Sequence, residues 1–156
     1  MTTLKRPVPE GFHTITPHLE LRDAARAIEF YKKAFGAVEI TRQSGPDGKS
    51  IMHCQLRIGD SMLLLHDEYA ESGGESPQTL EGSPVTLHLY VDDADAAVER
   101  AVKAGARVDM PVQDMFWGDR YCQITDPFGH HWSIAHKVTE LSPEQIRKGA
   151  AEYFEG

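Results

Sequence analysis

"TPHLELRDAARAIEFYKKA", residues 16–34, recurs later in the chain as "TLHLYVDDADAAVERAVKA", residues 86–104. Nine of the nineteen aligned positions are identical at a constant offset of 70. Because the matches keep one order along both halves, they indicate a duplicated supersecondary unit rather than chance local similarity. Further matches follow in the same order, namely Cys54 and Gln55 with Cys122 and Gln123, Gly59 with Gly129, and His66 with His136.

The two copies share one order of elements: a strand, a helix and three further strands. Asp23 and Asp93 precede the helices, where a carboxylate accepts the free amide hydrogens of the first turn. Gly36 and Gly105 are expected to end the helices, because glycine readily adopts the left-handed conformation found there. The residue patterns predict strands at about 13–22, 37–43, 50–58 and 61–67 in the first copy, and at about 84–92, 106–111, 119–125 and 131–137 in the second.

The predicted fold class is therefore α+β, with two tandem βαβββ modules and a C-terminal helix. Residues 68–83 are polar and rich in Gly, Ser and Pro, which predicts a linker between the modules. Ser142, followed by Pro143 and then Gln145, predicts the start of a helix at about 142–155. We expect a single domain over residues 1–156, with module one at about 13–67 and module two at about 84–137.

Composition and charge limit the partners that the chain can have. The net charge of −8 disfavours binding to nucleic acid and to anionic membranes, because like charges repel. No apolar run approaches the roughly 20 residues that a membrane span needs, and the first residues lack the apolar stretch of a secretory signal. Cys54 and Cys122 are therefore expected to be reduced core thiols. We expect a cytoplasmic protein without nucleic-acid or membrane partners.

Alternation along the strands separates a helix-covered side from a second, polar sheet face. The helix-covered side is expected to carry Leu19, Leu21, Met52, Cys54, Met62, Leu64 and His66, and in the second copy Leu87, Leu89, Cys122, Trp132, Ile134 and His136. The polar face is expected to carry Thr16, His18, Glu20, His53 and Gln55, and in the second copy Thr86, His88, Tyr90, Tyr121, Gln123, His131 and Ser133. This face is poor in Lys, Asp and Glu, the residues typical of a solvated surface.

A polar but sparsely charged face predicts a small-molecule site, because such sites present a few convergent hydrogen-bonding groups. The residues assigned to the polar face are the candidate ligand-binding residues. Trp117, in the loop 112–121, joins them because an aromatic side chain there can close over the ligand and stack on it. Glu20 is the candidate general base, since it is the one carboxylate on the polar side of the first strand. A solvated face or a dimer interface explains the same pattern.

The paired modules contain "DAARAIEFYKKAFGA", residues 23–37, and "WGDRYCQITDPFGHHWSIAH", residues 117–136. With these motifs the chain resembles the vicinal oxygen chelate superfamily, which is the glyoxalase, bleomycin-resistance and extradiol-dioxygenase group. Within that group it most resembles the PhnB-like branch, and the resemblance extends over about 13–140. It implies that the strands of the two modules curl into a half-open cup, and that the protein is a homodimer. The cup would hold a metal and its substrate, or a bound drug.

By the same resemblance, the family's metal ligands fall at Thr16 and Thr86 in the first strands and at Ser133 and Leu63 in the fourth strands. Hydroxyl groups bind divalent metals weakly and leucine does not bind them at all. The expected function is therefore a small-molecule-binding protein of the glyoxalase/bleomycin-resistance type, without cofactor and without the family's usual metal site.

Two alternatives stay open. A relocated site could use His18 and His88 as ligands of Zn, Ni, Mn or Fe, because neutral imidazole binds these ions. The protein would then be a metal-dependent lyase or isomerase of the glyoxalase type, or a dioxygenase-like enzyme. The second alternative is a dimeric interaction module whose polar sheet face is simply the dimer interface.

Overall fold

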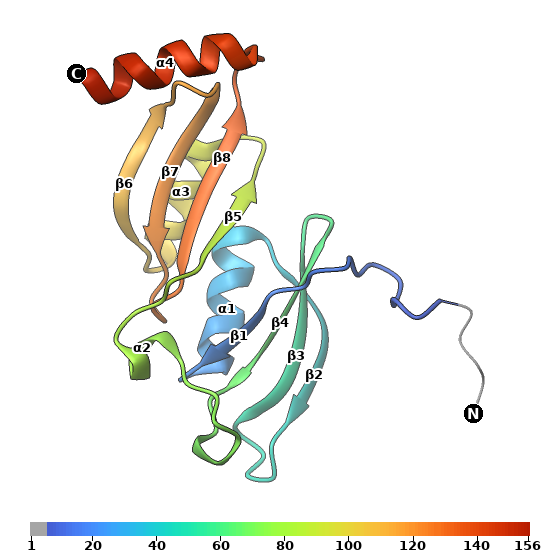
Figure 1. Cartoon of the computed structure of the whole chain (residues 1–156). Helices are drawn as coiled ribbons and strands as arrows, with labels where there is room; N and C mark the ends of the chain where they lie inside the picture. The colour runs from blue at the N-terminus through green and yellow to red at the C-terminus, as the bar shows by residue number, and fades with distance from the viewer. Residues whose placement is uncertain (1–5) are drawn as a thin grey trace. The chain divides into compact units, whose positions relative to one another are not determined.

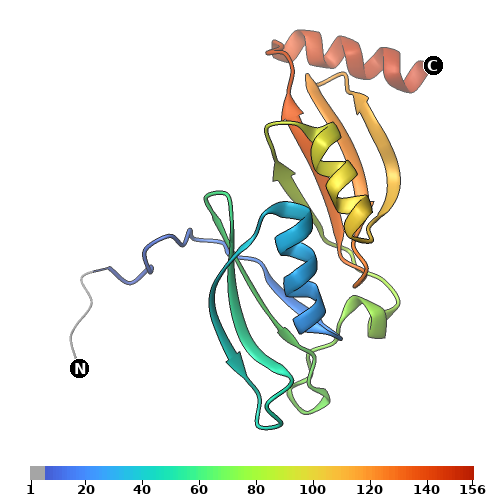
Figure 2. The ribbon, with the colours of Figure 1, turned by 180° about the vertical axis from the view of Figure 1, so that it is seen from behind.

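The structure is a computed structural model that describes residues 6–156. It divides into two compact units, of which the first ends at Gly82 and the second begins at Ser83. Each unit places one long helix against one face of a four-stranded sheet, as Figure 1 shows from one side and Figure 2 from the other. The α+β class and the repeated βαβββ order predicted from the sequence are confirmed.

The first unit contains the strands β1 (His18–Leu21), β2 (Val38–Ser44), β3 (Ile51–Ile58) and β4 (Ser61–Asp67), with helix α1 (Ala24–Phe35) after β1. The sheet order is β1-β4-β3-β2, and only the β1–β4 pair is parallel. The predicted linker is not featureless, because it forms a short 3-10 helix, η1 (Ala70–Ser72), and the single-turn helix α2 (Pro77–Leu80).

The second unit repeats this order with β5 (Thr86–Tyr90), α3 (Ala94–Ala104), β6 (Arg107–Asp114), β7 (Asp119–Thr125) and β8 (His131–Lys137). Its sheet order, β5-β8-β7-β6, matches that of the first unit. The C-terminal helix α4 (Pro143–Glu155) begins at the predicted capping box, where Ser142 and Gln145 satisfy each other's backbone amides. Among the described residues, no helix is long and apolar enough to cross a membrane.

Helices α1 and α3 begin in the same way. The Asp23 carboxylate accepts a hydrogen bond from the Arg26 amide, and that of Asp93 accepts one from the Ala96 amide. In each unit, the amide of the first helical residue donates a hydrogen bond to a side chain on the last strand of that unit in chain order. In the first unit Ala24 N donates to Asp67 Oδ1 over 2.7 Å, and in the second Ala94 N donates to His136 Nδ1 over 2.9 Å. Strand and helix are thereby tied together at matching points.

The core of each unit lies between its helix and its sheet. In the first unit, α1 buries Ala27, Ile28 and Tyr31 against the sheet. Cys54 on β3 is fully buried there, and burial raises the pKa of its thiol to about 11. Cys122, its counterpart on β7, is fully buried too, and burial again raises the thiol pKa. Both cysteines are free, as predicted, and neither thiol ionises readily.

Strand β4 departs from the predicted alternation. Leu63 and Leu65 are buried on the helix side, so Leu64 and His66 lie on the polar face. The cause is the turn before the strand. Arg57 pairs with Met62 across residues 58–61, whereas Thr125 pairs with His131 across residues 126–130, which is one residue more. The prediction aligned Gly59 with Gly129 and so placed β4 one position out of register with β8. An error of one residue assigns every side chain of the strand to the opposite face.

This correction changes two assignments. His66 is not a helix-side residue like His136; the helix-side counterpart of His136 is Asp67. The counterpart of Ser133 is Leu64 rather than Leu63, because Leu64 pairs with His18 as Ser133 pairs with His88. Met52 was also expected in the core, but it is 51% exposed. The pairing of β3 with β2 shifts at this point, from Gln43 with His53 to Ser44 with Ile51, and Ile51 is buried in place of Met52.

Glu68 fixes the segment that follows β4. Its carboxylate accepts hydrogen bonds from the Ser76 amide and the Thr79 hydroxyl and pairs with Arg22. The Ser76 amide is the largest cause of a pKa of about 2 for Glu68, down from 4.5. The hydrogen bonds therefore favour the ionised carboxylate, and their stabilisation is present above pH 4.5 and is lost as the pH falls towards 2.

Replacing Glu68 with glutamine is expected to lower the free energy of unfolding at pH 7 by about 1 kcal/mol, because charge-assisted hydrogen bonds become neutral ones. Urea unfolding at pH 7 and pH 3 measures the effect. The difference between the variant and the native chain should shrink at the lower pH. Glu71→Gln, an exposed residue of the same segment, is the matched control and should leave stability unchanged. An equal loss at both pH values would contradict the assignment.

Candidate functional site

The polar faces of the two sheets are built from matching positions. In the first unit His18, Leu64 and Gln55 lie side by side across β1, β4 and β3. In the second unit His88, Ser133 and Gln123 occupy the same places across β5, β8 and β7. Farther along these strands, Glu20 and His66 in the first unit correspond to Tyr90 and Ala135 in the second. One scaffold therefore carries two different sets of chemical groups.

In the second unit the polar face carries a continuous row of rings, here called the ring cluster: Tyr90, His88, Tyr121 and Trp117. The His88 ring centroid lies 4.6 Å from that of Tyr90, edge to face, and 6.1 Å from that of Tyr121, at an interplanar angle of 22°. The Trp117 ring meets that of Tyr121 edge to face at 5.3 Å. These are distances and orientations at which aromatic rings attract one another, so the cluster forms one coherent surface.

Asp119 anchors both ends of the ring cluster, although only 2% of this residue is exposed. Its Oδ2 accepts hydrogen bonds from Trp117 Nε1, at 3.1 Å, and from the Tyr90 hydroxyl, at 3.3 Å. Its Oδ1 lies 3.0 Å from Lys137 Nζ, and this contact raises the lysine pKa. A buried carboxylate that is paired and hydrogen-bonded is tolerable, and here it holds two rings in fixed positions.

Smaller groups complete the face. Ser133 is buried beside His88, with its Oγ 2.6 Å from His88 Nδ1. Gln123 Nε2 donates to the Tyr121 hydroxyl oxygen over 3.0 Å. Because the middle strand β8 carries only Ser133 and Ala135 between these larger groups, the rings of the flanking strands define the surface. Tyr90 is 64% exposed and His88 is exposed as well.

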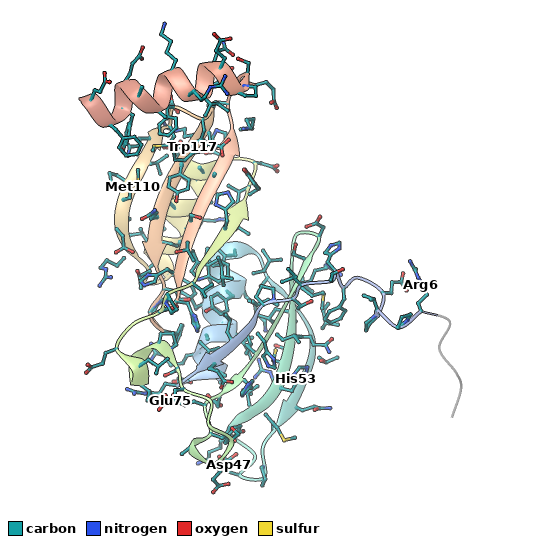
Figure 3. All side chains as sticks on the ribbon, in the orientation of Figure 1. Arg6, Asp47, His53, Glu75, Met110 and Trp117 are labelled. Carbon is teal, nitrogen blue, oxygen red and sulfur yellow. The ribbon has the colours of Figure 1, made fainter. Side chains whose placement is uncertain are left out.

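The remaining predicted residues of the second unit lie at the other end of the strands. Thr86 pairs with His131, whose Nδ1 lies 2.9 Å from Thr125 Oγ1. The Thr125 hydroxyl in turn donates to Asp109. His131 therefore belongs to a hydrogen-bonded chain separate from the ring cluster. Trp117, predicted to lie in a loop, does occupy the connection between β6 and β7, as Figure 3 shows.

In the first unit the polar face carries the imidazole cluster, defined as His18, His53 and His66 with Glu20. The His18 ring centroid lies 4.8 Å from that of His66 and 6.1 Å from that of His53, edge to face in both cases. His66 Nε2 lies 3.0 Å from Glu20 Oε1. His53, labelled in Figure 3, comes from β3, and its Nε2 lies 3.4 Å from Gln55 Nε2. Thr16 precedes β1 and lies outside the sheet.

Sequence reasoning missed His66 and Asp119 as members of these clusters. His66 was assigned to the helix side through the misaligned turn. Asp119 could have been found, because it stands two residues before Tyr121 and four before Gln123 and so shares their face. Glu20, the candidate general base, has its carboxylate against His66.

The residues at the positions of the family's metal ligands do not fit a divalent metal. Thr16 and Thr86 offer only hydroxyls, Leu64 has no donor atom, and the Ser133 hydroxyl is engaged with His88. Within residues 6–156, no group of three or more His, Cys, Asp or Glu side chains is arranged to hold a metal ion. His18 and His88, the relocated ligands of the alternative hypothesis, belong to different units.

Residues 13–134 match the family model of the Glyoxalase/Bleomycin resistance protein/Dioxygenase superfamily. An uncharacterized protein of Mycobacterium tuberculosis strain H37Rv is 46% identical over 145 residues, which cover 91% of this chain and 85% of that protein.

Solved structures agree on the fold. The crystal structure of TioX from Micromonospora sp. ML1 has a TM-score of 0.63 and 26% identity, covering 81% of this chain and 99% of TioX. The PhnB protein of Bacillus cereus has a TM-score of 0.62 at 13% identity, covering 80% of this chain and 99% of that one, and so shares the fold alone.

Proposed function

Because the chain belongs to the glyoxalase/bleomycin resistance protein/dioxygenase superfamily, we propose that it binds a small organic molecule that stacks on the ring cluster of its second unit. The observation that carries this proposal is the anchoring of Trp117 and Tyr90 by the buried Asp119. Rings that are already held in place lose little conformational freedom when a ligand arrives, and this favours affinity.

The chemistry of the cluster points to a planar, ring-bearing ligand. Tyr90 and Tyr121 offer aromatic faces, which attract flat apolar or cationic groups. The Tyr121 hydroxyl, Gln123 and His88 offer hydrogen-bonding atoms at the edges of the rings. The Asp119 charge is balanced by Lys137, so the cluster itself does not demand a charged ligand. The family's metal plays no part in this binding mode.

Replacing Tyr121 with leucine is expected to weaken ligand binding about tenfold, because the central ring of the cluster is lost while an apolar side chain remains. The ligand is first found by thermal-shift screening of the full chain against planar aromatic compounds, both neutral and cationic. Affinity is then measured through Trp117 fluorescence, which a stacked ligand changes. Trp132, the second tryptophan, is buried and gives a constant background.

Tyr153→Leu provides the matched control, because Tyr153 is half-exposed on α4 and lies outside the ring cluster. This variant should bind with native affinity. If no compound of the screen stabilised the chain, or if both leucine variants bound as tightly as the native chain, the ring cluster would not be the binding surface.

A further inference from the structure

Three side chains form a row across the polar face of the second unit, one from each of three neighbouring strands (Figure 1). Ser133 on β8 pairs with His88 on β5 and with Gln123 on β7. Residues that pair across neighbouring strands share one face of the sheet, with their Cβ atoms about 5 Å apart. The three residues, here called the serine row, therefore place a hydroxyl group between an imidazole and an amide.

The Ser133 hydroxyl donates its hydrogen to His88. Its Oγ lies 2.6 Å from His88 Nδ1. Ser133 is only 3% exposed, and among the described residues His88 is the one hydrogen-bond partner of its side chain. A buried hydroxyl hydrogen without an acceptor is unfavourable, so Oγ is the donor and Nδ1 the acceptor. In this arrangement an imidazole can take the proton of a nucleophile.

Two aromatic rings hold the His88 imidazole in this orientation. Tyr90 meets it edge to face at 4.6 Å, and Tyr121 lies 6.1 Å away at an interplanar angle of 22°. A base that activates a nucleophile needs a further group to orient it, and here the two rings serve that purpose. His88 is itself exposed, so a ligand on the ring cluster lies directly beside the hydrogen-bonded pair.

Gln123 supplies a hydrogen-bond donor on the other side of Ser133. It is exposed, and its Nε2 donates one hydrogen to the Tyr121 hydroxyl over 3.0 Å. An amide group carries two N–H hydrogens, so a second one is left for an oxygen of the ligand. A donor at this place stabilises the negative charge that develops on a carbonyl oxygen under nucleophilic attack.

We propose that the serine row hydrolyses aryl esters, with Ser133 as the nucleophile, His88 as the base and Gln123 as the donor to the oxyanion. This inference rests on the proposed function, because the aryl group of the ester is held by stacking on the ring cluster. The ester carbonyl then lies between His88 and Gln123, beside the Ser133 hydroxyl. The activity adds a covalent reaction to the binding of a planar ligand.

The reaction has two halves. In the first, the Ser133 hydroxyl proton moves to His88 Nδ1 and Oγ bonds to the carbonyl carbon, while the carbonyl oxygen takes the electron pair and accepts the Gln123 hydrogen bond. The carbonyl then re-forms, the bond from carbon to the phenol oxygen breaks, and that oxygen takes the proton from Nδ1. In the second half, water gives a proton to Nδ1 and its oxygen attacks the acyl carbon. The bond to Oγ breaks, Ser133 regains its proton, and a carboxylic acid is released.

The first unit carries a different group at the centre of the equivalent row. There Leu64 lies between His18 and Gln55, so a base and an amide flank a side chain that has no nucleophilic atom. Ester hydrolysis by this route is therefore confined to the second unit.

The test follows the release of the phenol from phenyl acetate, p-nitrophenyl acetate and p-nitrophenyl benzoate by the full chain. The native chain is expected to hydrolyse at least one probe about 100-fold faster than Ser133→Ala, the scale on which the loss of one catalytic group acts. Gln123→Met keeps the length of the side chain without its donor, and should lower kcat about 100-fold while KM changes little. Ser61→Ala is the matched control, since Ser61 is exposed at the start of β4, and should react like the native chain.

The covalent intermediate gives a second measurement, which needs no variant. A short reaction of the native chain with p-nitrophenyl acetate, stopped in acid, should leave one acetyl group on the protein. Peptide mass mapping should place this group on Ser133. His88→Gln should not acquire it, because the hydroxyl is no longer activated by a base.

Three outcomes would overturn the proposal. The first is hydrolysis by the native chain no faster than by Ser133→Ala for all three probes. The second is acetylation that maps only to residues other than Ser133. The third is hydrolysis that disappears in EDTA and returns with Zn²⁺, which would favour the relocated metal site instead. Because Trp117 fluorescence reports ligand binding separately in the native chain and in Ser133→Ala, failure here and failure of the proposed binding function are distinguishable.

Discussion

Replacing Asp126 with alanine is expected to lower the free energy of unfolding by about 3 kcal/mol, the largest stability change foreseen for a single side chain outside the hydrophobic core. Asp126 is buried in the turn between β7 and β8. Its Oδ1 accepts from the Phe128 and His130 amides and its Oδ2 from Trp132 Nε1, all at 2.9–3.0 Å. Alanine leaves these donors without this acceptor, and each unsatisfied buried donor costs about 1–3 kcal/mol.

Urea unfolding followed by tryptophan fluorescence measures this loss, and hydrogen exchange locates it at the Phe128 and His130 amides. Asp126→Asn is the informative comparison. An asparagine oxygen can still accept from the two backbone amides, but its NH2 group then faces the Trp132 N–H, donor against donor. Its loss should be about half that of alanine. A loss under about 0.5 kcal/mol for Asp126→Ala, the range of ordinary surface substitutions, would contradict the assignment.

Replacing Asp119 with alanine is expected to have the largest effect on ligand binding, with affinity falling at least about tenfold and stability by about 2 kcal/mol. The reason is indirect, because Asp119 is buried and acts on a ligand only through the two rings that it holds. Without its Oδ2, Trp117 and Tyr90 lose the acceptor that orients their rings. Ligand binding then has to order two mobile rings, which costs free energy.

Asp119→Asn separates orientation from charge, because the amide oxygen can still accept from both rings. It should keep most of the affinity. Asp114→Ala, an exposed carboxylate paired with Arg120 at the end of β6, is the matched control and should change neither affinity nor stability measurably. Fluorescence titration and thermal unfolding provide the two measurements. Native affinity in Asp119→Ala would show that the rings are held in place without it.

The contact with Lys137 adds a pH dependence. Asp119 raises the pKa of Lys137, so the pair stabilises the fold fully below the ordinary lysine value of 10.5 and loses this contribution as the pH rises above it. In Asp119→Asn this loss at high pH should be absent.

The architecture could be predicted from the sequence because the repeat is visible in the order of residues and because helix-capping residues act locally. Asp23 and Gly36 bound the first helix wherever the sheet lies, and their counterparts bound the second. The faces of the strands were harder to predict. Alternation assigns side chains to the correct face only within one strand, and a turn of unknown length breaks the count. Aligning the turns on Gly59 and Gly129 hid a one-residue difference in length. Counting pairs outward from the matched cysteines would have placed His66 on the polar face.

The candidate site could be predicted only in part, because its contacts depend on how different strands pair. The face assignments brought His88, Tyr121 and Gln123 together correctly. Trp117 is two residues from Asp119, but nothing in the spacing reveals that Tyr90 shares the same carboxylate. Tyr90 is far from Asp119 in the chain and meets it only through the pairing of β5 with β8 and of β8 with β7. The same holds for the commitment of Glu20 to His66, which the parallel pairing of β1 and β4 creates.

Asp67 and His136 accept the first amide hydrogen of their helices from the same place in two copies of one unit. One is a carboxylate and the other an imidazole, so an alignment that scores chemical similarity would count the position as lost. Both side chains nevertheless accept the same backbone hydrogen bond. Repeated units of this kind are better compared through the backbone group that a side chain satisfies than through the chemical type of that side chain. The residues on the polar faces of the two sheets can then differ without weakening the frame.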